Sequence, residues 1–543
     1  MMLRLPRKSW IPFVLVVSSM ADVSLGVPPG VRDPLGDRRV IYNSDLSNTT
    51  CHLSEAGATE DELREVVRNY AAVGAIDTLV QEIWHQGWST FWRTEKCPYD
   101  SRFQHERLLP LLNQGVAPVE IYIDECHRQG MEFFAGFRMN DRHGHNPEFF
   151  EELNRQHPDW ILTGYKPTSR SADPRSRELG CALNYAQEEV REFLFEIVEE
   201  AANRFDVDGI EFNFTRMPDC FPRGQAEESH EHMTRFVRKI RRMLDETGRR
   251  KGRKLEFGVR VLQHVEGCRK MGLDVARWIS EELIDYVAPG DVGFTDFNAK
   301  FEEFVELARP AGCRVYPQVE ARVGYHRRTP YHTLSQYRAA VTNIFGAGAD
   351  GFSTQNFQYH WGPRFSAPGD AGVQVPAMYP QAMQMLKQLR DPDLLKTGSR
   401  HYVFAPLWGP DGIDPTGTYM PERIELKRAA PGPRGEFRFR LCESVASWAT
   451  DEEPRVTLAF WPTIGPEDVI SVDVNGEVIS GVDIEYHWPD DPRQPVHCEC
   501  LLDPALLRYG DNVLGMRLIK SAAESEGDIV LHEVEVHVDV SEP

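Results

Sequence analysis

The chain has 543 residues, of which 41% are apolar and 27% charged, and its formal net charge is −22. The length allows two or three domains with large cores, and the composition is that of an ordinary globular protein. An excess of negative charge repels phosphate groups, so we predict no nucleic acid or anionic membrane surface as partner.

The first 27 residues have the order of a secretory signal. Basic side chains at Arg4, Arg7 and Lys8 precede an apolar run over residues 10–17, and small residues follow. This order predicts a signal-peptide-like leader and export to the periplasm or the extracellular space. The run is too short to cross a bilayer, and no later stretch is apolar for long enough, so we predict no membrane span.

Residues 38–395 alternate strand-like runs with helix-like runs. A capping-box pattern at Thr59 and Glu62 predicts a helix over 59–73, and apolar residues at helical spacing predict another over 187–205. Eight alternations predict an α/β fold, a (β/α)8 TIM barrel that forms the catalytic domain. A doubly wound sheet is the alternative, but no glycine-rich phosphate turn follows the first strand. The strands are predicted at 40–45, 75–84, 131–140, 207–214, 255–261, 284–289, 313–320 and 349–356.

Residues 400–541 change to short strands separated by proline and glycine. Asn475-Gly476 between two apolar alternations predicts a tight hairpin. Residues 507–514 read L-x-x-G-x-N-x-L, which resembles a turn of galactose-binding-like jelly rolls. We predict an all-β, jelly-roll-like sandwich that binds sugar or packs against the barrel, and we favour packing. Its strands are predicted at 423–427, 437–441, 455–460, 469–474, 513–519 and 529–538.

Ten cysteines are scattered along the chain. Their density is far below that of a disulfide scaffold, and Cys498-x-Cys500 lacks the second pair that a zinc site needs. Export would permit one or two disulfides, whose pairing the spacing does not define.

In a (β/α)8 barrel the active site lies at the carboxyl ends of the strands. The residues at those ends combine carboxylates, amides and guanidiniums, and aromatic residues follow several strands. Amides and stacked rings suit sugars, which present hydroxyl groups at their rim and C–H groups on their faces. We therefore predict a carbohydrate substrate held by Asn43, Glu82, Trp88, Arg138, Asn140, Asp141, His143, Asn213, Arg260, Asp291, Gln318, Gln355, Asn356 and Trp361.

Hydrolysis of a glycosidic bond needs two carboxyl groups that flank it. We predict that Glu211 on the fourth strand and Glu320 on the seventh form this pair. Opposed strands of a narrow barrel can place carboxyls about 5 Å apart, the spacing of a retaining mechanism. Each glutamate also has a structural alternative: Glu211 as an ion pair with Arg216 or Arg260, and Glu320 as an ion pair with Arg322.

Metal and cofactor chemistry has weaker signals. His143 and His145 could grip a metal, but a third ligand is missing and Gly144 between them favours a loop, so we predict no metal site. No phosphate cradle or cofactor motif is visible, and we expect no cofactor.

Several motifs around the fourth strand resemble those of a known family. His157-Pro158-Asp159-Trp160 precedes the phrase N-x-A-x-x-E-V-R at 184–191, and Asp208-Gly209-Ile210-Glu211 follows after a helix. These motifs resemble those of the bacterial family-10-like glycoside hydrolase barrels, many of which are exported. The resemblance covers roughly residues 38 to 395.

The resemblance implies an exported glycoside hydrolase that acts on a poly- or oligosaccharide. By analogy with retaining glycosidases, Glu211 would be the acid/base and Glu320 the nucleophile. This chain departs from the pattern because relatives often carry an acid where it has Asn213, and because Glu211 follows Ile210 rather than an asparagine. A non-catalytic carbohydrate-binding protein on a degenerate barrel is one alternative, and a metal-dependent lyase or isomerase is another.

Overall fold

The computed structural model contains a curled parallel sheet followed by two antiparallel sheets. No helix of the described part is both long enough and apolar enough to cross a membrane. The predicted leader at 1–27 lies outside the described residues. These are 38–45, 49–50, 53–54, 56–85, 89–100, 103–141, 147–162, 182–216, 218–291, 293–323, 332–355, 357, 380–407, 422–443, 454–491, 493–522 and 527–540.

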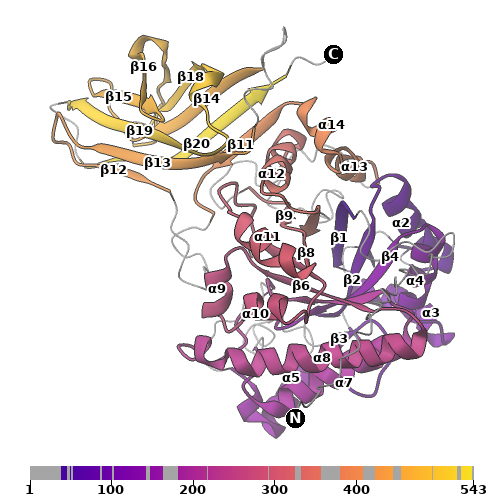
Figure 1. Cartoon of the computed structure of the whole chain (residues 1–543). Coiled ribbons are helices and arrows are strands. Elements are labelled where there is room, and N and C mark those ends of the chain that lie inside the picture. The colour runs from indigo at the N-terminus through magenta and orange to yellow at the C-terminus, as the bar shows by residue number, and fades with distance from the viewer. Residues whose placement is uncertain are drawn as a thin grey trace, which may run out of the picture. The chain divides into compact units, whose positions relative to one another are not determined.

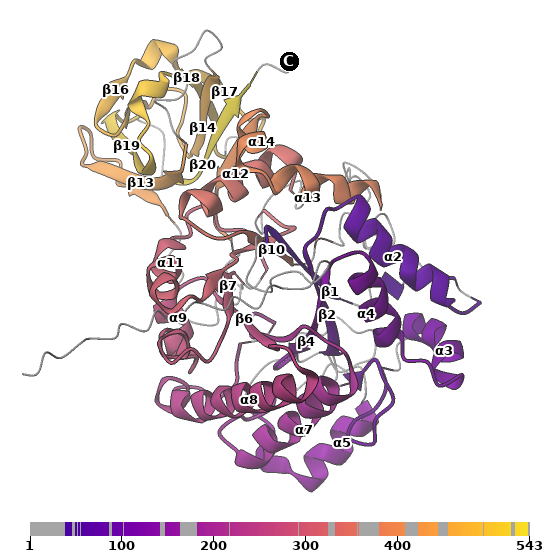
Figure 2. The same ribbon diagram turned by 45° about the vertical axis from the view of Figure 1, so that its right-hand side comes forward.

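The first part of the chain is a curled parallel sheet (Figures 1 and 2). Its strands follow the order β8-β7-β6-β5-β4-β2-β1-β10-β9, and the short β3 (Ser89–Thr90) pairs antiparallel with β2. The strands are β1 (Val40–Asp45), β2 (Thr78–His85), β4 (Glu132–Arg138), β5 (Gly209–Asn213), β6 (Glu256–Leu262), β7 (Tyr286–Gly290), β8 (Arg314–Val315), β9 (Gln318–Glu320) and β10 (Phe352–Gln355).

The strands at the two ends of this order, β8 and β9, follow each other directly in the sequence. β8 pairs with β7 and β9 pairs with β10, and only Tyr316 and Pro317 separate them. The Tyr316 amide donates to Val287 on one side, and the Pro317 carbonyl accepts from Ser353 on the other. The sheet therefore closes on itself, and the predicted TIM-barrel fold is confirmed. The predicted seventh strand is interrupted because Pro317 has no N–H to donate to a ladder.

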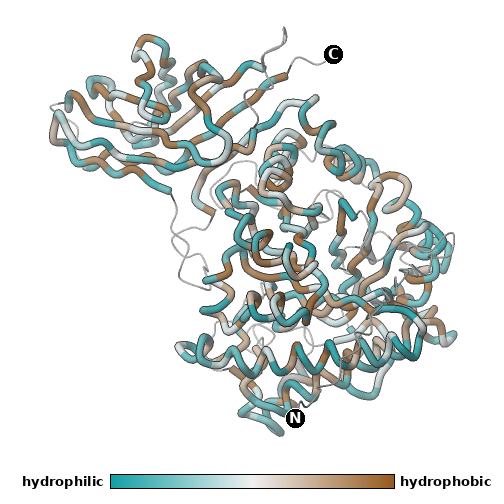
Figure 3. Tube along the Cα trace, viewed as in Figure 1, coloured by the Kyte–Doolittle hydropathy of each residue, from teal (hydrophilic) through white to brown (hydrophobic). Residues whose placement is uncertain are grey.

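Helices cover the outside of the strands (Figure 2). The predicted capping box is confirmed, since the Thr59 hydroxyl and the Glu62 side chain cap each other's backbone. Along α8, hydrophilic and hydrophobic residues alternate in the hydropathy colouring, as the apolar side turns inward (Figure 3). The helices are α2 (Glu60–Ala72), α3 (Leu109–Asn113), α4 (Pro118–Arg128), α5 (Pro147–Gln156), α7 (Glu188–Arg204), α8 (His230–Lys251), α9 (Val265–Lys270), α10 (Val275–Ser280), α11 (Glu302–Ala308), α12 (Leu334–Gly346), α13 (Gln384–Leu389) and α14 (Pro392–Lys396).

An apolar layer fills the barrel interior between two polar ones. It consists of Ile41, Val80, Phe134, Tyr286, Ala288 and Tyr316, all buried. At the amino ends of the strands, the Arg38 guanidinium lies between Glu132, at 2.6 Å, and Glu256, at 2.8 Å. The polar residues at the carboxyl ends of the strands form the third layer. The apolar layer separates the charged residues at the amino ends from those at the carboxyl ends.

The rest of the chain forms two antiparallel sheets, as predicted (Figure 1). The Phe404 and Phe439 rings, one from each sheet, are 5.7 Å apart, so the sheets pack face to face. One sheet has the path β11-β20-β14-β18-β17 with β12 beside β20, and the other is β13-β19-β15-β16. The strands are β11 (Arg400–Phe404), β12 (Ile424–Leu426), β13 (Arg434–Leu441), β14 (Arg455–Pro462), β15 (Val469–Val474), β16 (Glu477–Ile479), β17 (Glu485–His487), β18 (His497–Leu502), β19 (Gly510–Lys520) and β20 (Ile529–Asp539).

Two sequence signals in this part correspond to turns. Asn475 and Gly476 both have positive φ angles, and they join β15 to β16 in the predicted hairpin. Asn512 is buried and holds the turn before β19 through hydrogen bonds with Arg508 and Gly510. The motif around Asn512 is therefore structural.

The C-terminal sheets contact the barrel through α12. The Asn343 side chain donates to the Arg440 carbonyl at 3.0 Å and accepts from the Cys442 amide at 2.8 Å. Packing was the favoured prediction for this part, and these hydrogen bonds agree with it. The eight cysteines among the described residues are buried free thiols.

Candidate active site

The carboxyl-end layer of the barrel is a connected set of polar side chains from β1, β2, β4, β5, β6, β9 and β10. Parallel register brings them together, since Asp45 pairs with Glu82, Arg138 with Asn213, and Gln355 with Glu320. Side chains two apart on a strand share a face, so these residues line the interior as the strand alternation predicts. All of them are buried.

Arg138 is the centre of one half of this layer. Its guanidinium lies 2.9 Å from Asp45, 2.5 Å from Glu82 and 2.9 Å from Asp141. Burial acts to lower the pKa of Arg138, but Glu82, Asp45 and Asp141 together raise it above its ordinary value. Three carboxyl groups therefore contact the single guanidinium of Arg138.

The environment of Glu82 shifts the pKa of its carboxyl group. Burial raises the pKa of Glu82 above its ordinary value, Arg138 opposes the shift, and the charge of Asp45 adds to it. The Asn213 amide donates to Glu82 Oε1 at 2.9 Å. A carboxyl whose pKa is raised by burial can hold a proton near neutral pH and donate it as a general acid.

Glu211 lies deeper in the barrel than this group. Its Oε1 accepts from Arg260 Nε at 3.1 Å and from Asn43 at 3.3 Å. Its Oε2 accepts from the Tyr286 hydroxyl at 2.8 Å and from Arg260 Nη2 at 3.5 Å. Burial and the adjacent Glu211 raise the pKa of Tyr286, which keeps that hydroxyl protonated. This geometry is that of a buried ion pair with Arg260, the structural alternative for Glu211.

Amide groups of β5, β9 and β10 form a connected set next to Glu82. Asn213 Oδ1 accepts from the Thr215 hydroxyl at 2.9 Å, and that hydroxyl lies 3.1 Å from Gln355 Oε1 and 3.5 Å from Gln318 Oε1. Gln318 Nε2 in turn donates to the Ala288 carbonyl at 2.8 Å. Side chains of three strands thus hold one another in fixed positions.

Glu320 ends β9, on the side of the barrel near α12. Its backbone is bracketed by Thr295, whose hydroxyl accepts from the Glu320 amide and donates to the Glu320 carbonyl. Burial and the charge of Glu320 raise the pKa of Tyr337 on α12. The Glu320 side chain is buried.

Two other predicted residues have mainly structural contacts. Asn140 holds the segment before α7, because its amide exchanges hydrogen bonds with the backbone of Leu183 and also donates to the Asp219 carbonyl. Asp291 caps its own turn by accepting from the amides of Gly293 and Phe294. The predicted residues Trp88, His143, Asn356 and Trp361 lie outside the described part of the chain.

The sequence prediction missed three contributors to this layer: Tyr286, Thr215 and Ser353. Thr215 continues the two-residue alternation from Glu211 through Asn213, and that signal could have identified it. Tyr286 is the first residue of β7, and Ser353 lies within β10, so neither ends its strand. The Ser353 hydroxyl accepts from Arg260 at 3.0 Å. Residues that lie away from the carboxyl ends of the strands cannot be identified from those ends alone.

Groups that could hold a metal occur in the six-stranded sheet. His401, Glu535 and His537 form one group, and His487, His497 and Glu499 form a second, more exposed one. The barrel layer carries carboxylates and amides that suit proton transfer and hydroxyl recognition.

The comparisons with known proteins bear on the first half of the barrel. Residues 43–234 match the family model described as "Glycosyl hydrolase-like 10". The predicted resemblance is confirmed for this segment. The glycosyl hydrolase-like 10 segment runs from β1 into α8 and carries Glu82, Arg138, Glu211 and Asn213, whereas Arg260 and Glu320 lie beyond it. A search of curated proteins found no match.

Solved structures similar to this chain include several glycosidases. An α-L-fucosidase isoenzyme 2 from Paenibacillus thiaminolyticus is 12% identical with a TM-score of 0.42, and the match covers 68% of this chain and 51% of that one. The glycoside hydrolase domain of PgaB (BpsB) from Bordetella bronchiseptica is 12% identical with a TM-score of 0.37, over 66% and 99% of the two chains. This chain thus spans about half of that fucosidase.

Proposed function

We propose that the barrel is a glycoside hydrolase that acts on a poly- or oligosaccharide. The observation that carries the proposal is the layer of carboxyl groups at the carboxyl ends of the strands, where barrel enzymes perform their chemistry. Asp45, Glu82 and Asp141 meet there around Arg138, and Glu320 ends β9 in the same layer beside amide groups that suit sugar hydroxyls. The match of residues 43–234 to a glycosyl hydrolase-like family supports the same reaction class.

Glu320 is the proposed nucleophile and Glu82 the proposed proton donor of a retaining reaction. Glu82 has the raised pKa that a donor needs, and Arg138 beside it stabilises the carboxylate that remains after donation. Glu211, the donor by analogy with retaining glycosidases, accepts hydrogen bonds from Arg260, Asn43 and Tyr286, whereas Glu82 accepts one from Asn213 and pairs with Arg138. We assign it a positioning role, in which it orients Arg260 and Asn43.

A glycan hydrolysis screen with amide variants tests these roles. Glu82→Gln and Glu320→Gln should keep saccharide binding and lose turnover by about a hundredfold or more, because each lacks its ionisable group. Glu211→Gln should retain turnover per folded molecule. Glu132→Gln, at the opposite end of the barrel, is the matched control for the loss of a buried carboxylate. Turnover lost in folded Glu211→Gln but kept in Glu82→Gln would return the donor role to Glu211.

The stereochemistry of the product tests the retaining mechanism. A substrate found in the screen is hydrolysed inside a proton NMR spectrometer, and the anomeric signal of the first product is recorded. Retention requires two carboxyl groups about 5 Å apart, whereas inversion requires a wider gap that admits water. A first product of inverted configuration would contradict the nucleophilic role of Glu320.

A second candidate function is non-catalytic carbohydrate binding on a degenerate barrel. The complete pairing of Glu211, together with an amide at Asn213 where relatives often carry an acid, favours it. A glycan array and a sugar-release assay on the same ligands distinguish the candidates. Array binding with no reducing sugar released by the wild type would support the binding protein.

We also propose that the chain is exported, on the basis of the basic and apolar order of residues 1–27. Expression with and without these residues, followed by fractionation of the cells, tests the proposal. Export should require them, and equal export of the truncated chain would contradict it.

A further inference from the structure

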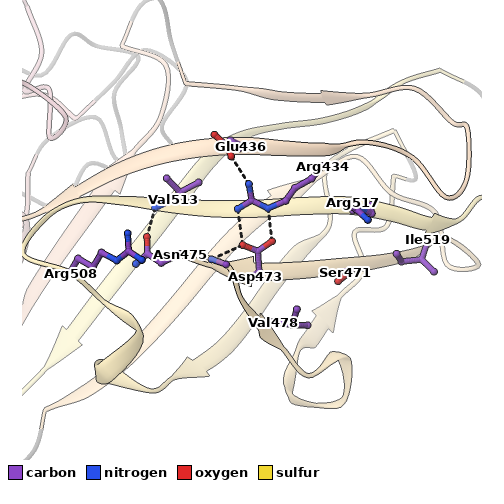
Figure 4. A pocket seen from close by; sticks show the side chains of 11 residues that line it. Arg434, Glu436, Ser471, Asp473, Asn475, Val478, Arg508, Val513, Arg517 and Ile519 are labelled. Carbon is purple, nitrogen blue, oxygen red and sulfur yellow. Dashed lines mark hydrogen bonds and ion pairs between the residues drawn. The ribbon is translucent and has the colours of Figure 1, made fainter.

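The four-stranded sheet carries a groove that the proposed reaction does not use. It has a volume of about 620 Å³, within the range of small-molecule sites, and side chains of β13, β15, β16 and β19 line it (Figure 4). Arg434 and Glu436 come from β13, Asp473 from β15 and Arg517 from β19. The groove thus lies on the face of the sheet that is turned away from the packed core.

An ion pair occupies the middle of the groove. Arg434 donates two parallel hydrogen bonds to Asp473, at 2.8 and 2.7 Å, and a third to Glu436 at 2.5 Å. The pair lies against Gly515 of β19, where a Cβ atom would come within 2.2 Å of Asp473 Oδ2. Only glycine leaves room for this arrangement, so the floor of the groove depends on it.

Two further arginines of the groove make no direct contact of this kind. Among the described residues, the side chains of Arg508 and Arg517 have no hydrogen bond or ion pair, and both are exposed. Figure 4 shows Arg508 at one end of the groove and Arg517 at the other, with the Arg434–Asp473 pair between them. Three arginines and two carboxylates line the groove, which leaves an excess of one positive charge on a chain whose net charge is −22. Arg434 and, to a smaller extent, Arg517 lower the pKa of Asp473.

The remaining lining sets the nature of the ligand. Ser471 adds a hydroxyl group, and the exposed Val478 and Ile519 add apolar surface beside it. Such a surface contacts both the hydroxyl rim and the C–H faces of a saccharide. Guanidinium groups bind carboxylates and sulfates through paired hydrogen bonds, and two of them at opposite ends match charges that are spaced along a chain.

We propose that this groove binds an acidic saccharide whose carboxylate or sulfate groups contact Arg508 and Arg517. The saccharide class follows from the proposed function of the barrel, and the charge follows from the groove itself. The groove would hold an acidic polymer while the barrel acts on it. The binding site and the hydrolytic site are thus separate, and each has its own test.

Isothermal titration of the full chain tests the proposal with three oligosaccharides of equal length. Tetragalacturonate carries carboxylates, a heparin tetrasaccharide adds sulfates, and cellotetraose is neutral. The variant is Arg508→Gln with Arg517→Gln. Its matched control is Arg242→Gln with Arg249→Gln, which removes the same charge from the exposed face of α8. Thermal unfolding verifies that both double variants are folded.

We expect at least one acidic tetrasaccharide to bind more tightly than cellotetraose, and added salt to weaken it by screening. The groove variant should lose about tenfold in affinity, as expected for two exposed charge-assisted contacts, while the α8 control keeps wild-type affinity. Binding of tetragalacturonate would identify carboxylate as the recognised group, and binding of the heparin tetrasaccharide alone would identify sulfate. Equal affinity of wild type and groove variant, or equal binding of cellotetraose, would overturn the proposal. Turnover in the barrel is not measured, so failure of the hydrolase proposal would appear separately, in the amide variants of Glu82 and Glu320.

Discussion

The two ends of the barrel interior each hold an arginine that contacts two or more carboxyl groups. Arg38 at the amino end contacts Glu132 and Glu256, and Arg138 at the carboxyl end contacts Asp45, Glu82 and Asp141. The amino-end arginine also lies over the Phe134 ring, 5.6 Å from its centre. The carboxyl-end arginine instead adjoins a network of amides that reaches β9 and β10 through Thr215.

This difference shows that a buried ion cluster does not by itself mark a catalytic site. Structural ion pairs perturb pKa values as strongly as catalytic ones do. Glu256 at the amino end has a raised pKa just as Glu82 does at the carboxyl end. Position distinguishes them, since the loops that bind substrate in barrel enzymes follow the carboxyl ends of the strands.

Replacing each arginine by methionine should have the largest effect and tests the comparison directly. Either change leaves buried carboxylates without their cation, so we expect a loss of about 3 to 5 kcal/mol in unfolding free energy from Arg38→Met and from Arg138→Met. Urea titration measures both. Only Arg138→Met should lower kcat/KM of the folded protein. The comparison fails if folded Arg38→Met loses as much activity as Arg138→Met.

The amino-end cluster should also give a pH dependence of stability. Burial raises the pKa of Glu256 from 4.5 to about 7, against the opposing charge of Arg38. The folded state then holds a proton that the unfolded state releases, so this stabilisation is complete below about pH 4.5 and is lost as the pH rises through 7. Relative to Glu256→Gln, the wild type should lose on the order of 3 kcal/mol.

Urea unfolding of both proteins at pH 5 and pH 8 measures this loss. The glutamine variant cannot ionise at this position, so it reports the pH dependence of all other groups. Identical pH dependence in the two proteins would show that Glu256 does not carry the effect.

A smaller effect should come from the layer between the two ends. Tyr286→Phe removes the hydroxyl that donates to Glu211 Oε2 at 2.8 Å, while Arg260 remains in place. The loss of one hydrogen bond to a charged group should cost about 1.5 to 3 kcal/mol. Chemical denaturation gives this value. A change of less than about 0.5 kcal/mol would mean that Glu211 does not depend on Tyr286.

Most of the fold could be predicted because its signals are local. The strands Val40–Asp45 and Val469–Val474 have the predicted bounds, since each is a short run flanked by turn residues. The strands β3, β11, β17 and β18 were missed, because two to six residues carry too little periodicity. The break at Pro317 could have been inferred from the proline itself.

The site could be predicted only in part, because its partners meet through register. The alternation of Glu211 and Asn213 was sufficient to place both in the interior, and Arg260 was one of two partners considered for Glu211. That Arg138 would join Asp45 to Glu82 depends on how three neighbouring strands align. No local pattern contains that alignment.

The buried thiols have a consequence for biogenesis if the chain is exported. Burial raises the pKa of Cys97 and of Cys498 to about 12, so the native protein presents them as unreactive thiols. During transit through an oxidising compartment, the same groups are exposed to oxidants until the strands close around them. Folding must then be faster than oxidation of the thiols, and a reducing refolding buffer should raise the yield of active protein.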